Sequence, residues 1–147
     1  RIMILLSHRG NIKGPRPDLE NSPFYLLTAL EKGYDVEVDV WYKDDKWYLG
    51  HDGPQYLVER VFVETKGLWC HAKNLQALEN MIECGIHCFW HQEDDFTLTS
   101  KGHLWTYPGK PVCSRSIIVC KDEATTLRMA KEDIKGICSD YVEKIRV

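Results

Sequence analysis

Two histidines near the start of the chain stand where β-like stretches end. His8 closes the apolar run of residues 2–6 and precedes Arg9. His51 closes the stretch of residues 47–50. Because an imidazole can accept or donate a proton near pH 7, two histidines can form a general acid/base pair. A single histidine at such a place is more often structural, but two of them together favour a functional pair.

Two acidic residues lie between these histidines in a run that alternates with valines. Glu37 and Asp39 are two positions apart, so on a strand their side chains share one face. Val36, Val38 and Val40 then take the other face. Acids on the inner face of a closed sheet are costly unless they bind a cation, and carboxylates suit Mg²⁺ or Ca²⁺. The alternative is a solvated edge strand with no metal.

Two cationic residues accompany these groups. Arg9 and Lys73 each lie beside a predicted strand end. Arginine can bind a phosphate through two parallel hydrogen bonds, and lysine acts as a point charge. Each residue alone is most often a surface residue. A divalent ion, two cations and two histidines together fit phosphoryl chemistry.

The elements that must position these residues alternate between strands and helices. Apolar, β-rich runs predict strands over residues 2–7, 35–42, 68–72, 87–91, 104–107, 116–120 and 136–140. Helical spacing predicts helices over residues 23–32, 75–84 and 123–131, with Ser22, Asn74 and Asp122 as N-caps. A hairpin turn is predicted at residues 43–46, and a second hairpin-like excursion at residues 94–102.

Alternating strands and helices imply a parallel sheet with crossover helices. The 147 residues form one predicted domain, shorter than the ~250 residues of a full (β/α)₈ barrel. We therefore predict an α/β fold, a reduced TIM-type barrel of mostly parallel strands with several helices missing. Missing helices would expose apolar barrel surface, which makes a homo-oligomer plausible.

The composition is that of an ordinary globular chain. Hydrophobic residues make up 44% and charged residues 28%. The net charge of -3 gives no basic field, so we expect no nucleic-acid partner. No apolar run approaches the ~20 residues of a membrane-spanning helix. No signal peptide is visible, and the first residue, Arg1, leaves open a processed, trimmed or partial chain.

The six cysteines include no Cys-x-x-Cys pair. Several of them lie in apolar stretches, as Cys70 and Cys138 do. This pattern favours buried free thiols in a reducing cytoplasm over a disulfide framework or a cysteine zinc site. We therefore expect a cytoplasmic protein.

Four motifs follow one another in roughly the first third of the chain. They are Ser7-His8-Arg9-Gly10, Glu20-Asn21-Ser22-Pro23, the acid-valine run of residues 33–40, and Gly50-His51-Asp52. In order and spacing they resemble the motifs of glycerophosphodiester phosphodiesterases, in the phosphatidylinositol-phospholipase-C-like phosphodiesterase superfamily. The later chain resembles that family less closely, through Ala72-Lys73-Asn74 and Cys138-Ser139-Asp140.

The resemblance implies an activity and a role for each candidate residue. The reaction would be hydrolysis of a glycerophosphodiester, or of a related small phosphodiester, with a divalent cation such as Mg²⁺ or Ca²⁺. A neighbouring hydroxyl can attack first, through a cyclic phosphate. The implied acid/base pair is His8 and His51, the metal ligands are Glu37 and Asp39 with Glu20 nearby, and the phosphate contacts are Arg9 and Lys73.

One position departs from the family pattern. The usual third metal-binding carboxylate, two residues before the lysine, is His71 here. His71 either binds the metal, which would favour another ion, or does not bind it. Two other functions therefore stay open: a non-catalytic phosphodiester-binding barrel, and a lyase that releases a cyclic phosphate.

The later aromatic segment adds three residues with two interpretations each. His91, at a predicted strand end, either contacts the same centre or is a structural histidine. Trp105 and Tyr107 either line a pocket or belong to the core. His87 and His103 are expected to be structural or exposed.

Overall fold

The computed structural model describes residues 2–145. Its strands are β1 (Ile4–His8), β2 (Asp35–Lys43), β3 (Lys46–Leu49), β4 (Tyr56–Val58), β5 (Leu68–Ala72), β6 (Cys88–Phe89), β7 (Phe96–Leu98), β8 (Leu104–Thr106), β9 (Ser116–Cys120) and β10 (Gly136–Ser139). Its helices are α1 (Pro23–Glu31), α2 (Arg60–Val63), α3 (Leu75–Glu83), α4 (Glu123–Met129) and a short 3₁₀ helix (Val142–Lys144).

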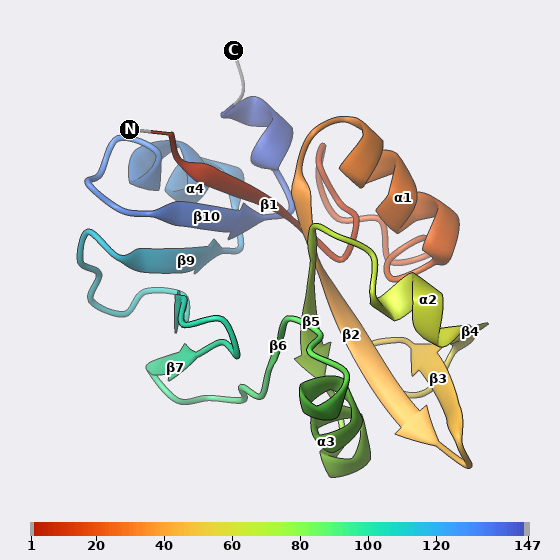
Figure 1. The fold of residues 1–147 in the computed structure, drawn as a ribbon. Coiled ribbons are helices and arrows are strands. Elements are labelled where there is room, and N and C mark those ends of the chain that lie inside the picture. Colours follow the sequence, from red (N-terminus) through yellow and green to blue (C-terminus); the bar gives the residue numbers. More distant parts are fainter. Residues whose placement is uncertain (1, 146–147) are drawn as a thin grey trace.

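The strands form one curled sheet of ten strands (Figure 1). Neighbours are parallel along the series β6-β5-β2-β1-β10-β9-β8. Strands β3, β4 and β7 join as antiparallel hairpin partners. This half-barrel confirms the predicted α/β fold and its reduced TIM-type architecture.

The two ends of the parallel series, β6 and β8, are connected by hydrogen bonds from the loop between β7 and β8 and not by a strand pair within the described residues. The Ser100 N–H donates to the Cys88 carbonyl oxygen at 2.7 Å. The Cys88 N–H donates to the Ser100 hydroxyl at 2.9 Å. The polar groups at this edge of β6 are thereby satisfied without a neighbouring strand, as buried backbone requires. Strand β6 is shorter than the predicted 87–91, because its ladder with β5 pairs only the two residues Cys88 and Phe89 within the described chain.

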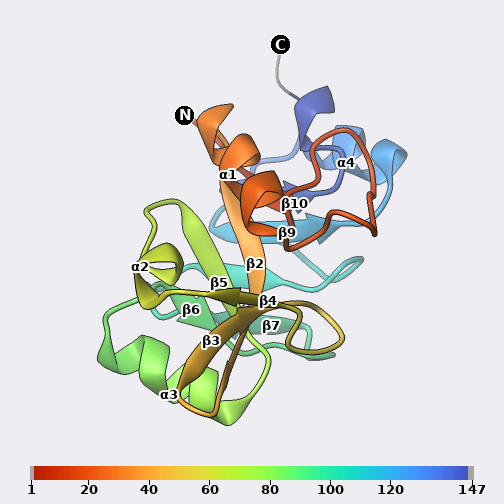
Figure 2. The same cartoon turned by 90° about the vertical axis from the view of Figure 1, so that its right-hand side faces the viewer.

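Three helices cover the outer face of the sheet. Helix α1 packs on β2, α3 packs on β2, β5 and β6, and α4 packs on β9 and β10 (Figures 1 and 2). The predicted caps hold at two of them, because Asn74 accepts from the Ala77 N–H and Asp122 from the Thr125 N–H. Ser22 precedes α1 but makes no side-chain cap bond to the described residues of the helix. Within residues 2–145, no helix joins β6 to β8 or β8 to β9.

Strand β2 divides the molecule into an apolar outer layer and a polar interior site. Val36, Val38 and Val40 are fully buried in the core cluster that also contains α1 and α3 residues. Each such side chain contributes roughly 1.5–3 kcal/mol by leaving water. Glu37 and Asp39 alternate with them and are also buried. The alternation therefore predicted the two faces correctly, and the edge-strand alternative is wrong, because β1 and β5 flank β2.

The two hairpin predictions are also confirmed. Asp44 and Asp45 both have positive φ, 53° and 61°, as a two-residue type I′ turn requires. The excursion at residues 94–102 contains β7, which pairs with β8. All six cysteines are free, and four of them are buried. Among the described residues, none of the helices combines the length and apolar character needed to cross a bilayer.

Candidate active site and metal centre

A cavity of about 190 Å³ lies at the carboxyl ends of the parallel strands. This is the end at which parallel α/β barrels place their active sites. Its lining comes from β1, β2, β5, the loop after β3 and the segments that follow β6, β8 and β9. It contains His8, Arg9, Glu37, His51, His71, His91, Gln92, Trp105, Tyr107, Pro108, Val119 and Lys121.

At this end of the sheet, two buried acids, Glu37 and Asp39, and the half-buried His71 form a cluster suited to a metal ion. Glu37, Asp39 and His71 each offer one ligand atom, and these atoms all lie within 4.8 Å of one another. The His71 Nδ1 is 3.5 Å from Glu37 Oε2 and 3.4 Å from Asp39 Oδ1. The parallel register of β2 and β5 sets Asp39 opposite His71. His71, the residue that departs from the family pattern, therefore lies where a third ligand is needed.

The hydrogen bonding of His71 leaves one ring nitrogen for a cation. Its Nε2 lies 2.7 Å from the His91 carbonyl oxygen. A carbonyl only accepts, so Nε2 carries a proton and Nδ1 faces the carboxylates of Glu37 and Asp39. Histidine ligands of metals usually donate their other N–H to such a carbonyl or carboxylate. Within residues 2–145, Glu37 Oε1 and Asp39 Oδ1 are buried without a hydrogen-bond partner. These unsatisfied oxygens fit a bound cation.

Without a metal ion, a proton takes the cation's place electrostatically. Burial alone would lower the pKa of His71, but hydrogen bonding and the charges of Asp39 and Glu37 outweigh it and raise that pKa to about 9. Burial alone would raise the pKa of Asp39, but His71 and Arg9 outweigh it and lower that pKa. Near neutral pH the two carboxylates of the cluster therefore face a positive charge, which is either the protonated His71 ring or a metal ion.

His8 is oriented by a carboxylate from the far end of the chain. Its Nδ1 lies 2.8 Å from Asp140 Oδ1, and its Nε2 lies 3.8 Å from Glu37 Oε1. Asn11 donates to the same Asp140 oxygen at 2.9 Å. Burial alone would lower the pKa of His8, but the bond to Asp140 and the charge of Glu37 raise it. A histidine that donates through Nδ1 to a fixed carboxylate presents Nε2 for proton transfer, as in catalytic triads.

Arg9 and Glu20 form a second group beside the metal cluster. Arg9 Nε is 3.3 Å from Asp39 Oδ2, and its Nη1 donates to Glu20 Oε1 at 3.3 Å. Asn11 donates to Glu20 Oε2 at 3.0 Å. Glu20 thus orients Arg9 and Asn11, and it is not a member of the Glu37, Asp39 and His71 cluster.

The other two predicted site residues, His51 and Lys73, are not members of the cluster. His51 lines the cavity from the loop after β3, with its Nδ1 at 2.7 Å from Asp52 Oδ1 and its side chain 44% exposed. Lys73 follows β5, and its backbone N–H donates to the Val40 carbonyl oxygen at 2.8 Å. The described residues that line the cavity do not include Lys73.

Three residues with supporting contacts were given no role from the sequence. Asn21 donates to Asp39 Oδ2 at 2.9 Å and accepts from the Asp39 N–H at 3.0 Å. Asp140 orients His8, and Lys121 lines the cavity. The available signals were the position of Asn21 in the Glu20-Asn21 motif, the position of Asp140 as the last residue of a predicted strand, and that of Lys121 directly after one.

The residues with two open interpretations are now placed. The His91 Nε2 lies 2.7 Å from the Asp94 carbonyl oxygen, and because a carbonyl only accepts, this nitrogen donates its proton there and is not free for a metal. Its backbone carbonyl holds His71. Trp105 and Tyr107 both line the cavity, and Trp105 is also part of the buried cluster inside the barrel.

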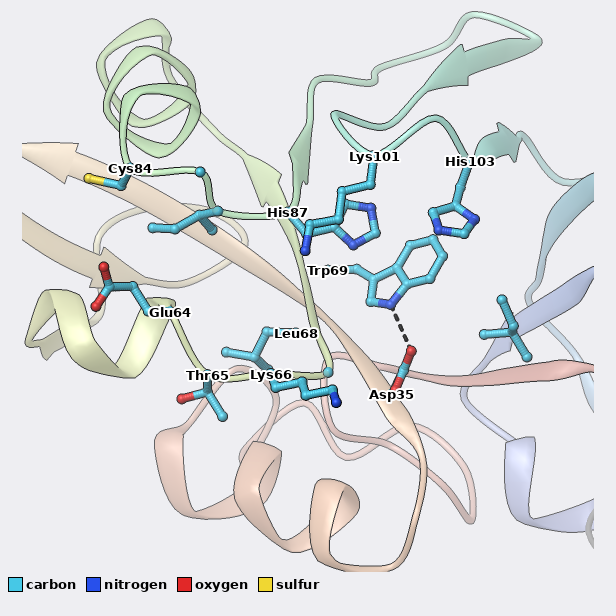
Figure 3. Close-up of a pocket in the computed structure, with 14 residues that line it drawn as sticks. Asp35, Glu64, Thr65, Lys66, Leu68, Trp69, Cys84, His87, Lys101 and His103 are labelled. Atoms are coloured by element: carbon cyan, nitrogen blue, oxygen red, sulfur yellow. Dashed lines mark hydrogen bonds between the residues drawn. The ribbon is translucent and has the colours of Figure 1, made fainter.

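A second cavity, of about 390 Å³, opens at the amino ends of the strands (Figure 3). The Trp69 ring packs against both His87 and His103, with centroid distances of 4.4 and 4.6 Å, and the two histidine rings lie 5.4 Å from each other. Its Nε1–H donates to Asp35 Oδ2 at 2.9 Å. Burial lowers the pKa of His87 to about 4, so this ring is neutral at pH 7. Although this cavity is the larger, the described residues place no three-ligand metal cluster in it.

Comparison with known proteins gives one result on the fold. No protein-family model matches the chain, and no curated protein sequence matches it. The crystal structure of a glycerophosphodiester phosphodiesterase from Agrobacterium tumefaciens str. C58 is similar, with a TM-score of 0.60, 13% sequence identity and coverage of 99% of both chains. At this identity the similarity shows a shared fold.

Proposed function

We propose that this chain is a metal-dependent phosphodiester hydrolase that acts on glycerophosphodiesters or a related small phosphodiester. The main observation is that one cavity is lined by His8, whose ring is held by Asp140, and by Glu37 and His71 of the metal cluster. The fold shared with the glycerophosphodiester phosphodiesterase from Agrobacterium tumefaciens supports the proposal.

Glu37, Asp39 and His71 would hold a divalent cation, for which we propose Mg²⁺ or Ca²⁺ despite the imidazole of His71, because two of the three ligands are carboxylates. When bound, such an ion neutralises phosphate charge and polarises the phosphoryl group. Arg9 adds a fixed positive charge, because Glu20 and Asp39 hold its guanidinium in place. Lys73, at the carboxyl end of β5, is the second proposed phosphate contact.

His8 and His51 are the proposed acid/base pair. One removes the proton from the attacking water or substrate hydroxyl, and the other protonates the leaving oxygen. Asp140 stabilises the imidazolium that forms when His8 takes a proton. His51 approaches from a different element, the loop after β3, so the two rings can serve different oxygens of the phosphodiester.

The test is hydrolysis of a chromogenic phosphodiester with added Mg²⁺ or Ca²⁺ by His8→Ala and His51→Ala. We expect each variant to lose about 10²–10⁴-fold in kcat. His103→Gln, at the amino ends of the strands, is the matched control and should keep full activity. Full activity in either the His8 or the His51 variant would refute the acid/base assignment.

Two alternatives share this site and give different products. A lyase would release a cyclic phosphate that phosphorus NMR distinguishes from a hydrolysed phosphomonoester. A non-catalytic binding barrel would give calorimetric binding of a phosphodiester with no product at all.

A further inference from the structure

The segments that follow β8 and β9 bring an unpaired cation and an aromatic ring to the same wall of the cavity. Tyr107 follows β8 and Lys121 follows β9, and these strands are parallel neighbours. The Lys121 Nζ lies 5.8 Å from the centre of the Tyr107 ring. Within the described chain, Lys121 makes no ion pair with a carboxylate, whereas Lys110 pairs with Asp95 at 3.4 Å.

The charges around this wall favour an anion over a cation. Among the described residues that line the cavity, the carboxylate is Glu37, which belongs to the metal cluster. The segments after β6 and β8 contribute His91, Gln92, Tyr107 and Pro108 to the lining, and none of these side chains carries a carboxylate. An incoming anion can therefore pair with Lys121 without displacing an existing acidic partner.

The ring of Tyr107 is not free to receive a cationic group. A quaternary ammonium group is normally recognised by an open aromatic face. Here the Lys121 ammonium already lies over the Tyr107 ring, and the His91 ring packs against Tyr107 at 5.7 Å with an interplanar angle of 67°. A cationic alcohol such as choline would have to displace Lys121 and would meet its charge.

We propose that Lys121 and Tyr107 form the subsite for the alcohol moiety of the substrate, and that this subsite selects an anionic alcohol over a cationic one. The inference rests on the proposed phosphodiesterase function, and it identifies a specificity-determining residue for that reaction. The cavity of about 190 Å³ is smaller than the roughly 300–1,000 Å³ of pockets for drug-sized ligands, so the alcohol is small.

The experiment compares two glycerophosphodiesters of similar size, one with choline and one with 3-hydroxypropanoate as the alcohol. Release of glycerol 3-phosphate gives kcat and KM for each. We expect wild type to prefer the carboxylate substrate by about fivefold in kcat/KM, the effect of an exposed charge pair worth ~1 kcal/mol. The preference should lie in KM, because Lys121 does not touch the reacting atoms.

Two variants at Lys121 and one control test the cause. Lys121→Gln should abolish the preference, and Lys121→Glu should reverse it. Lys131→Glu makes the same charge change beyond the end of α4, outside the cavity, and should keep the wild-type preference. A wild type that prefers choline or shows no preference, or a preference unchanged by Lys121→Glu, would overturn the inference.

A binding measurement distinguishes a failure of the subsite inference from a failure of the proposed function. If wild type hydrolyses neither substrate, the proposed function fails. Calorimetric titration of the same two diesters then decides the subsite. Tighter binding of the carboxylate diester, lost in Lys121→Gln, supports it, and equal binding or no binding overturns it.

Discussion

Replacing Asp140 by asparagine tests what the negative charge of Asp140 contributes to the function of His8. The Asp140 carboxylate accepts from His8 at 2.8 Å and from Asn11 at 2.9 Å through the same oxygen. The asparagine carbonyl can accept both bonds, so the geometry is kept while the charge is lost. We expect Asp140→Asn to lower the pKa of His8, because the attraction of the imidazolium to Asp140 is removed.

The size of the effect follows from the burial of the pair. The Asp140 side chain is 13% exposed, so water replaces little of the lost charge. A hydrogen bond to a charged group contributes ~1.5–3 kcal/mol, against ~0.5–1.5 kcal/mol for a neutral pair. The difference between the middles of these ranges, about 1.25 kcal/mol, predicts a roughly eightfold fall in kcat/KM, because an imidazolium that forms in the transition state loses this stabilisation. If the substitution also changed which ring nitrogen of His8 carries the proton, kcat/KM would fall further.

The assay is the pH profile of kcat/KM, combined with an NMR titration of the His8 ring. Asp52→Asn is the matched control: Asp52 lies 2.7 Å from His51 but is 97% exposed, so water screens its charge. The control should change kcat/KM less than threefold. Unchanged activity and an unchanged His8 titration in Asp140→Asn would refute the role of Asp140, as would an equal effect in the control.

Two further predictions concern the metal cluster. Because the pKa of His71 in the fold, about 9, exceeds its unfolded value of 6.5, its proton stabilises the metal-free fold fully below about pH 6.5. This contribution to the free energy of unfolding, on the order of 3 kcal/mol, is lost as the pH rises through 9. Urea unfolding in the presence of a chelator at pH 6 and pH 9.5 measures it. Equal stabilities of His71→Gln and wild type at both pH values would contradict it. Asn21→Ala removes both hydrogen bonds to Asp39 and should lower the free energy of unfolding by about 2–4 kcal/mol. The control Asn80→Ala loses one exposed hydrogen bond on a helix surface and should lower it by less than ~0.5 kcal/mol. Equal losses in the two variants would argue against the Asn21 contacts.

Local patterns in the sequence predicted the strands and the direction of their side chains. Side chains on a strand alternate between two faces, so the acid-valine run of β2 was enough to predict that Glu37 and Asp39 share the face opposite the valines. Strand β4 and helix α2 were not predicted, because three or four residues are too short to show a period.

The tertiary structure alone decided which residues meet. His8 and Asp140 are 132 positions apart, and only the parallel pairing of β1 with β10 brings them together. His71 presents Nδ1 to the acids because the His91 carbonyl, 20 positions away, accepts from its Nε2. Periodicity determines which face a side chain occupies, but the order and register of strands distant in sequence determine its neighbours. The residue types therefore indicated phosphoryl chemistry, and the barrel assembled the individual groups of the site.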